Sequence, residues 1–421
     1  MLKVIAMIDG LYELIKEGDR LYDAGDYAEA RKYFDQVLSL NPSNAYAIYL
    51  IAWILDKQNF VNKSREYFKS AIIAYSKELE SDRSNALNWY RKGTSLSMIG
   101  DHKEAISCLN RSLEIDPSSV NAWTQRGTSL SDLGDFEDAI KCYSKAIEID
   151  PKSVVACVNM GATLSESGRY EESLRFLERA LEMEPSLTVA IDNMGVALHY
   201  LGRLEDAIQC YKKAMEIDPQ CAERWEYIGF SLDKMGKFED AIKCYSKAIE
   251  IDPIMANTWV YKGVSMWNLG LFEDSAKCFK KAVEIDPQCA KGWHMVSNRS
   301  FNLGLYEESL IHIDRALKID PTMADLWVAK GVVLLKLGGR IDAIKCFDRA
   351  LEIDSSNGGA FLNKGNTLLD ICKYQEAIDC FDKAIETDDP ELNDAWHGKG
   401  FALCRLGRDE EALDSYEKWL S

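Results

Sequence analysis

The prolines of this 421-residue chain fall at a constant interval. Seven consecutive prolines, from Pro117 to Pro321, are spaced by 34 residues, and Pro42 holds the same place in an earlier unit. The same interval after Pro321 reaches residue 355, which is Ser355. The following interval reaches residue 389, and the proline there is Pro390, one residue further on. A fixed period of about 20–50 residues is the signature of stacked structural repeats. The period therefore favours one repeating array over the two or three globular domains that the length alone suggests.

Twelve units result when the proline is placed at position 32 of each unit. They begin at residues 11, 45, 86, 120, 154, 188, 222, 256, 290, 324, 358 and 393. Residues 1–10 are expected to form a helical N-terminal extension, and residues 11–421 a continuous array. The second unit is seven residues longer than the standard unit, which predicts about two extra turns in its second helix.

Four positions of the unit carry residues with a clear physical role. Position 8 is Gly in ten of the twelve units, which predicts a close approach of two helices. Position 15 is also Gly in ten units, as expected where a helix ends in a left-handed turn. Position 20 is always Ala or Ser, and position 24 is aromatic in nine units, so both belong to one apolar helical stripe.

With Trp at position 4 in seven units, Ala common at position 27 and Pro at position 32, this pattern resembles the tetratricopeptide repeat. The resemblance covers residues 11–421, and departures such as Ser297, Ser355 and Trp419 weaken single units only. It implies an all-α fold, namely a right-handed superhelical α-solenoid of about twelve 34-residue helix-turn-helix repeats. It also implies a protein-interaction scaffold that binds an extended or helical polypeptide in the concave groove lined by the first helices.

The composition indicates which classes of partner are unfavourable and in which compartment the protein is expected. The formal charge of −18 and a pI near 4.9 disfavour nucleic acid as a ligand. The longest uncharged window, residues 36–55, is interrupted by Asn41-Pro42-Ser43-Asn44, so no membrane insertion is expected. Twelve cysteines without a secretory signal predict reduced thiols in the cytoplasm.

No pattern for catalysis or metal binding stands out in the sequence. His-Glu-x-x-His, Gly-x-Ser-x-Gly, the phosphate-binding Gly-x-x-x-x-Gly-Lys and Cys-x-x-Cys are all absent. We therefore expect a non-enzymatic protein without a cofactor or a metal ion.

The positions expected to face the groove fall into an acidic region and an aromatic region. Aromatic side chains gathered on a concave face suit protein or peptide binding, and Tyr46, Tyr49 and Trp53 add to them near the N-terminus. The alternative for each residue is packing against the neighbouring repeat. The candidate binding residues are Asn193, Glu226, Tyr227, Phe230, Tyr261, Val264, Trp267, His294, Asn298 and Phe301. The expected partner is a polypeptide with a basic segment beside an apolar one.

Two other functions stay open at this stage. No polar capping helix follows Trp419, and an uncapped solenoid end exposes apolar surface, so a structural protein that self-associates through its C-terminal end is one alternative. The other alternative is a regulatory arm of a separate enzyme, which the sequence does not distinguish from a scaffold.

Overall fold

The computed structural model describes residues 2–387 and 393–420, so Pro390 lies outside the described residues. The described residues form 24 α-helices and no strand, which confirms the predicted all-α fold. The chain divides into two compact units, Met1–Pro219 and Gln220–Ser421, and each is described separately.

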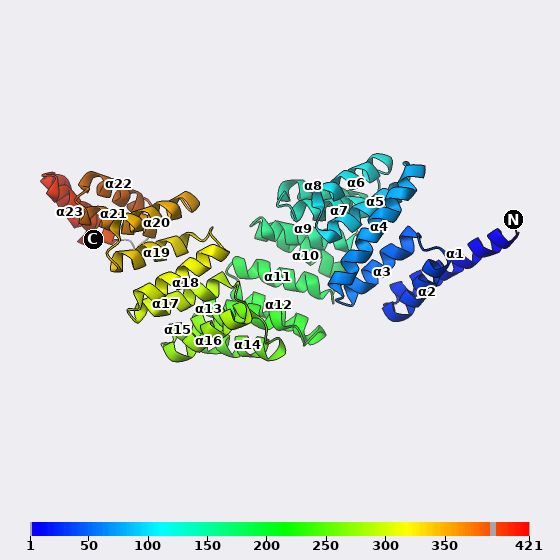
Figure 1. Ribbon diagram of the computed structural model, residues 1–421, viewed down its shortest axis with the longest axis horizontal. Coiled ribbons are helices and arrows are strands. Elements are labelled where there is room, and N and C mark those ends of the chain that lie inside the picture. Colours follow the sequence, from blue (N-terminus) through cyan, green and yellow to red (C-terminus); the bar gives the residue numbers. More distant parts are fainter. Residues whose placement is uncertain (1, 388–392, 421) are drawn as a thin grey trace. The chain divides into compact units, whose positions relative to one another are not determined.

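The first unit contains helices α1 to α12 (Figure 1). Their bounds are α1 (Leu2–Asp23), α2 (Tyr27–Leu40), α3 (Ala45–Lys57), α4 (Val61–Ser81), α5 (Ala86–Ile99), α6 (His102–Ile115), α7 (Val120–Ser131), α8 (Phe136–Ile149), α9 (Val154–Glu166), α10 (Tyr170–Met183), α11 (Thr188–Tyr200) and α12 (Leu204–Ile217).

The second unit contains helices α13 to α24, again in short pairs. Their bounds are α13 (Ala222–Lys234), α14 (Phe238–Ile251), α15 (Ala256–Asn268), α16 (Phe272–Ile285), α17 (Ala290–Asn302), α18 (Tyr306–Ile319), α19 (Ala324–Lys336), α20 (Arg340–Ile353), α21 (Gly358–Asp370), α22 (Tyr374–Ile385), α23 (Asp394–Arg405) and α24 (Asp409–Leu420).

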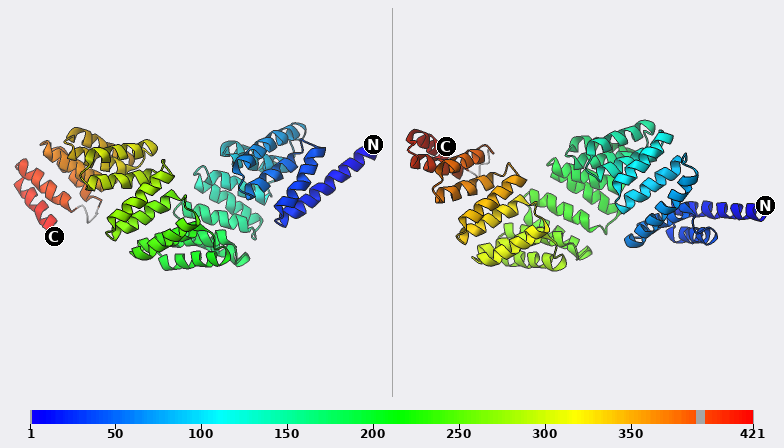
Figure 2. Two further views of the ribbon diagram at one scale, coloured as in Figure 1. Left: turned by 60° about the horizontal axis from the view of Figure 1, so that its bottom comes forward. Right: turned by 45° about the horizontal axis from the view of Figure 1, so that its top comes forward.

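Within each unit the helices stack as successive pairs. Each odd-numbered helix packs against the even-numbered helix that follows it, and that helix packs against the first helix of the next pair, as the two views of Figure 2 show. First helices of adjacent pairs also touch, for example α15 and α17. This layering confirms the predicted α-solenoid of helix-turn-helix repeats. Helix α4 has 21 residues where α2 and α6 have 14, which confirms that the insertion lengthens that helix.

Position 8 is glycine because the large side chain at position 24 of the second helix, an aromatic ring in most repeats and leucine at Leu109 and Leu177, lies directly against it. A Cβ added to Gly331 would lie 2.4 Å from Cε1 of Phe347, and one added to Gly229 would lie 2.5 Å from Cε1 of Tyr245. Carbon atoms in van der Waals contact are about 3.5–4 Å apart. The close helix approach predicted from position 8 is confirmed, and its partner is the residue at position 24.

Position 15 is the left-handed turn between the two helices of a repeat. All ten glycines there have φ between +73° and +92°. The two repeats without glycine at this position have Asn59, with φ of 60°, and Cys372, with φ of 62°. These are the two non-glycine residues with positive φ in the described chain. Asparagine tolerates this region, whereas cysteine adopts it at a cost.

Replacing Cys372 by glycine is therefore expected to raise the free energy of unfolding by about 0.5–1 kcal/mol, because the strain at positive φ is removed. Urea unfolding followed by circular dichroism measures the change. The reverse substitution Gly338→Cys, at φ of +85° in the neighbouring repeat, is the matched control and is expected to destabilise the chain. A Cys372→Gly variant less stable than wild type contradicts the strain argument.

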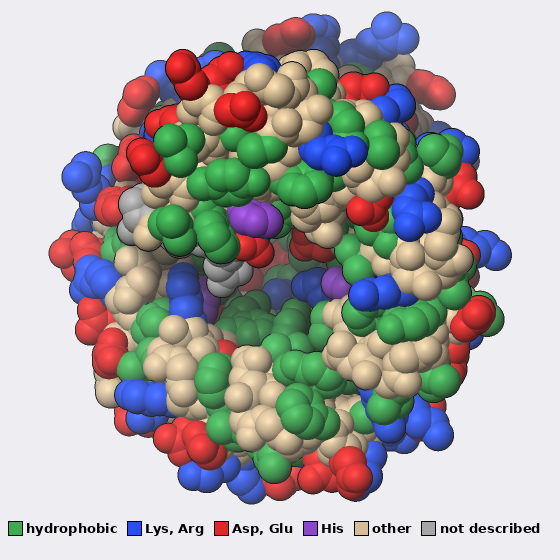
Figure 3. Space-filling model, turned by 90° about the vertical axis from the view of Figure 1, so that its left-hand side faces the viewer, with side chains coloured by type: hydrophobic (Ala, Val, Ile, Leu, Met, Phe, Trp, Pro, Cys, Tyr) green, Lys and Arg blue, Asp and Glu red, His purple; other side chains and the backbone are tan. Residues whose placement is uncertain are grey.

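The outer surface carries both signs of charge. On the face shown in Figure 3, Lys and Arg side chains are interspersed with Asp and Glu side chains. Many of these form pairs one turn apart on the second helices, such as Lys243 with Asp240 at 2.8 Å. Among the residues that the structure describes, no helix combines the length and apolar character needed to cross a bilayer.

Candidate functional site

Nine of the ten candidate binding residues lie on three first helices of the second unit: α13, α15 and α17. All nine side chains are partly accessible, and Tyr227 is the most exposed of the large ones, at 37%. Asn193 lies on α11 of the first unit and is half-buried there. The structure therefore gathers nine of these residues on one helix layer and leaves Asn193 separate.

Four aromatic side chains form one part of this layer, here called the aromatic cluster: Tyr227 and Phe230 from α13, Tyr245 from α14 and Tyr261 from α15. The ring of Phe230 meets Tyr261 edge-on, with 4.4 Å between centroids, and lies 6.0 Å from both Tyr227 and Tyr245. Edge-to-face pairs at these distances are favourable. These rings thus lock α13 to α15 and leave part of Tyr227 open to solvent.

A second group surrounds a hollow between α15 and α17, here called the apolar pocket. It has a volume of about 220 Å³. It is lined by Val264, Trp267, Phe279, Met295, Asn298, Phe301 and Asn302. Phe272 supports the Trp267 ring from one side, with centroids 4.8 Å apart, and Tyr306 supports Phe301 at 5.4 Å. The pocket wall is therefore held in place by rings behind it.

Three lining residues are outside the candidate set. Met295 and Asn302 occupy expected groove positions, so their sequence position could have added them to the set. Phe279 belongs to the position-24 stripe, which the sequence assigns to the core, and it is 2% exposed. Its ring closes the floor of the pocket because it packs against Gly263 on α15. The sequence alone does not show this second role, because it depends on how α15 and α16 pack against each other.

Two carboxyl groups of α13 are bound by neighbouring hydroxyl groups. Asp233 accepts hydrogen bonds from the Tyr245 hydroxyl at 2.7 Å and from Ser265 Oγ at 2.7 Å. Glu226 accepts one from the Thr258 hydroxyl. Burial raises the pKa of both carboxyl groups, and the hydrogen bonds from these hydroxyl groups only partly offset it.

A raised pKa in the folded state means that the folded chain prefers the protonated carboxyl group. Its stabilising effect is present below the unfolded pKa of about 4 and is lost as the pH rises through the folded pKa. The difference in melting temperature between wild type and the Asp233→Asn variant is therefore expected to become smaller as the pH rises from about 3.5 to 7. Melting temperatures of both proteins across this range measure it.

The control for this pH dependence is Asp240→Asn on α14. The hydrogen bond and charge of Lys243 lower the pKa of the exposed Asp240, so its stabilising effect is lost as the pH falls. The two variants should therefore diverge from wild type in opposite pH directions. Parallel curves for the two variants contradict the assignment of burial as the dominant effect at Asp233.

Two further groups complete the layer. Lys291 Nζ lies 3.5 Å from the Tyr261 hydroxyl and 5.7 Å from the centre of its ring. His294 on α17 is half-buried and precedes the pocket residue Met295, and burial lowers the pKa of its imidazole. A histidine with a lowered pKa is neutral at pH 7 and can both donate and accept a hydrogen bond.

The aromatic residues near the N-terminus do not form a comparable surface. Tyr49 is buried, and Trp53 is half-buried and packs edge-on against Phe68 at 5.5 Å. The Tyr46 hydroxyl donates to Asp19 at 2.9 Å, and the Arg91 guanidinium lies over the Tyr46 ring. Tyr49 is thus a packing residue, and Tyr46 and Trp53 make contacts within and between repeats while staying partly accessible. Val260, at a groove-facing position of α15, is also buried.

The described residues hold no gathering of three or more His, Cys, Asp or Glu side chains able to bind a metal ion. The cysteines carry free thiols, and most of them are buried. Burial raises the pKa of the Cys108 thiol to about 11, which keeps it protonated at neutral pH.

Known proteins similar to this chain are repeat proteins. A TPR repeat-containing protein of Methanocaldococcus jannaschii is 30% identical over 88 residues, which span 21% of this chain and 16% of that relative. Yeast Tom70 has a similar fold, with a TM-score of 0.53 and 13% identity over 95% of this chain and 96% of that one. YrrB, described as a TPR protein with an unusual peptide-binding site, matches 44% of this chain and 95% of its own, with 23% identity and a TM-score of 0.38.

Family models described as tetratricopeptide repeat match most of the chain. The matched residues are 15–78, 86–119, 120–153, 153–220, 222–254, 256–289, 328–392 and 362–421. These ranges contain the glycine, small-residue and aromatic positions whose packing is described above. The chain therefore belongs to the tetratricopeptide repeat family.

Proposed function

We propose that the chain is a non-enzymatic interaction scaffold that binds a polypeptide segment across α13, α15 and α17. The observation that carries this proposal is the apolar pocket between α15 and α17. A half-open apolar hollow with a few polar groups at its edge is typical of a site that takes one anchoring side chain. Its volume of about 220 Å³ suits one leucine, methionine or phenylalanine side chain of a partner.

The rim of the pocket supplies the polar contacts that an extended chain needs. The amides of Asn298 and Asn302 each offer donors and an acceptor. An extended backbone has free N–H and C=O groups on alternating sides, and side-chain amides can pair with them without regard to the partner's sequence. The pocket would then select the anchor residue and the asparagines would hold the backbone beside it.

Charge favours a basic residue in the part of the segment that lies over α13. Glu223 is exposed on α13 one turn before Glu226, and the whole chain carries a net charge of −18. Complementary charge at the edge of an interface raises the rate of association and helps to fix the register. The partner segment thus combines an apolar anchor residue with a lysine or arginine elsewhere in the same segment. Free thiols suit a reducing compartment, and we place this interaction in the cytoplasm.

Selection from a displayed library of random 12-residue peptides against the full chain tests the proposal. The selected peptides are expected to share one large apolar residue and to carry a basic residue elsewhere in the peptide. Phe301→Ala is expected to weaken their binding at least tenfold, measured by fluorescence anisotropy, because truncation of a central anchor contact costs more than about 1.4 kcal/mol.

Ile311→Ala is the matched control, because Ile311 is an exposed apolar residue of α18, 65% accessible, and does not line the pocket. It is expected to leave peptide affinity unchanged. Peptides that bind wild type and Phe301→Ala equally well, while circular dichroism shows both to be folded, rule out the apolar pocket as the anchor site.

A further inference from the structure

A hydrogen bond joins the turn between adjacent repeats to the tryptophan at position 4 in five repeats. The indole N–H donates to the backbone carbonyl of the residue six positions earlier, at 2.9–3.4 Å. The pairs are Trp89 with Arg83, Trp123 with Pro117, Trp259 with Pro253, Trp293 with Pro287 and Trp327 with Pro321. Where Cys157 replaces the tryptophan, Arg179 donates to Pro151 instead, at 2.5 Å.

The repeat that begins at residue 358 keeps this turn but lacks a donor. Asp354, which ends α20, has φ of −130° and ψ of 97°, and Asp320 at the equivalent place has −132° and 97°. The Ser356 N–H donates to Asp354 at 2.9 Å, as the Thr322 N–H donates to Asp320. The Ser355 carbonyl therefore points as the Pro321 carbonyl does. The residue at position 4 of this repeat is Phe361, whose side chain has no N–H group.

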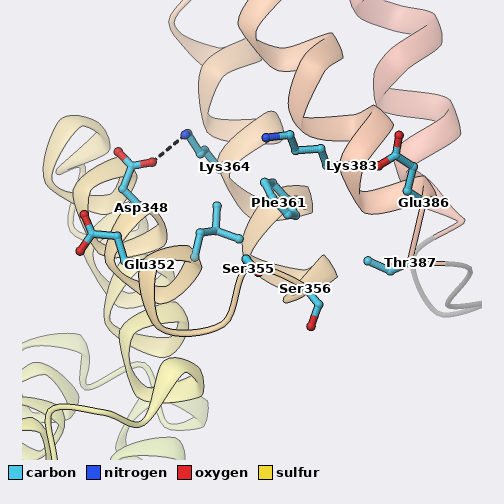
Figure 4. A pocket seen from close by; sticks show the side chains of 10 residues that line it. Asp348, Glu352, Ser355, Ser356, Phe361, Lys364, Lys383, Glu386 and Thr387 are labelled. Atoms are coloured by element: carbon cyan, nitrogen blue, oxygen red, sulfur yellow. Dashed lines mark ion pairs between the residues drawn. The ribbon is translucent and has the colours of Figure 1, made fainter.

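The missing indole coincides with an enlarged hollow, here called the Phe361 notch, between α20, α21 and α22 (Figure 4). Its volume is about 980 Å³, against 590 Å³ and 510 Å³ for the equivalent hollows beside Trp89 and Trp293. The lining includes Leu351, Ser355, Phe361, Lys364, Lys383 and Glu386. It is separate from the apolar pocket, which uses α15, α16 and α17.

The charges of the notch favour a flat aromatic group. Lys364 is neutralised by Asp348 at 2.6 Å, the pair drawn in Figure 4. The Lys383 ammonium lies 5.3 Å from the centre of the Phe361 ring and makes no ion pair with any residue in the described ranges. An ammonium group held beside one ring can be shared with a second ring that stacks there. In the repeat that begins at residue 290, the counterpart of Lys383 is Arg315 on α18, whose guanidinium lies 4.1 Å from the centre of the Trp293 ring.

We propose that the Phe361 notch binds a tryptophan side chain of a partner protein. The indole ring stacks against Phe361 and Lys383, and its N–H donates to the Ser355 carbonyl, which restores the bond that five other repeats make within the chain. This surface lies on helices other than those of the proposed peptide site, so either interaction can fail without the other. A tryptophan is favoured over phenylalanine or leucine because only the indole satisfies the carbonyl.

Fluorine NMR of 5-fluoroindole with the full chain tests this inference. A ten-atom ligand of this kind is expected to bind with a Kd of about 1 mM. Phe361→Trp, which installs the residue found at seven other repeats, is expected to fill the notch and weaken binding at least tenfold. Fluorobenzene, which lacks the N–H, is expected to bind wild type more weakly than 5-fluoroindole.

Two further variants complete the design. Trp293→Phe should free the Pro287 carbonyl beside Arg315, the counterpart of Lys383, and add a second 5-fluoroindole site of similar affinity. Phe60→Trp adds an indole at an exposed position between α3 and α4, in the first unit. It should leave binding at the Phe361 notch unchanged. Equal binding by wild type and a folded Phe361→Trp variant, or no added site in a folded Trp293→Phe variant, overturns the inference.

Discussion

Replacing Gly331 by alanine is expected to destabilise the second unit by about 2–3 kcal/mol. The added methyl group would lie 2.4 Å, 2.7 Å and 2.9 Å from three ring carbons of Phe347. That ring is completely buried, so it cannot turn away without disturbing α19 and α20. Urea unfolding measures the loss, and hydrogen exchange of the α19 and α20 amides locates it, because a repeat array opens locally.

The control for Gly331→Ala is Gly359→Ala on α21. The nearest neighbour of a Cβ at Gly359 is an Asn357 oxygen at 3.5 Å, which is an ordinary contact. This alanine is expected to be neutral or slightly stabilising, because glycine is a poor helix former. A similar loss at both positions would mean that backbone freedom, rather than contact with the Phe347 ring, explains the glycines at position 8.

A natural solution to the same contact suggests a rescue. The repeat that begins at residue 290 has Ser297 at position 8 and Ile313 at position 24, and both are buried. The double variant Gly331→Ser, Phe347→Ile is therefore expected to cost less than the sum of its two single variants. If the destabilisation of the double variant equals the sum of the two single variants to within about 0.5 kcal/mol, the two positions do not interact.

Replacing Trp293 by alanine is expected to cost about 3 kcal/mol, because one side chain joins two repeats. Its N–H donates to the Pro287 carbonyl at 3.0 Å. The ring stacks on His312, with centroids 5.5 Å apart, and the Arg315 guanidinium lies 4.1 Å from its centre. Truncation removes all three contacts and leaves a carbonyl without its donor.

Trp293→Phe separates the hydrogen bond from the ring. It keeps a stacking partner for His312 and Arg315, so it is expected to cost only about 1 kcal/mol. Urea unfolding of both variants, with hydrogen exchange at α17 and α18, measures the two effects. A phenylalanine variant as unstable as the alanine variant would assign the stabilisation to the N–H bond instead of the ring contacts.

The sequence predicts the packing positions of this fold well because the same constraint acts in every repeat. A glycine facing a ring recurs from Gly18 with Phe34 to Gly400 with Tyr416. Comparison of units within one chain therefore replaces comparison between proteins. The left-handed turn at position 15 is predicted for the same reason, and its exceptions, Asn59 and Cys372, keep a positive φ.

The sequence predicts the surface less well. Tyr49 and Tyr90 both occupy position 5 of a first helix, yet Tyr49 is buried and Tyr90 is partly accessible. Tyr49 is covered because Trp53, Phe68 and Tyr75 all pack edge-on around it. Exposure of a groove position depends on the side chains of the adjacent helices, and a position number carries no information about them.

The sequence by itself determined the repeat, the helix pairs, the glycine contacts and the family, because each follows from local geometry repeated every 34 residues. Only the tertiary structure decided which aromatic residues are buried, that Phe279 forms the floor of a pocket, and that five tryptophans donate to the carbonyl whose counterpart at Ser355 faces Phe361. These features arise between helices, where the shape of a cavity depends on several side chains at once.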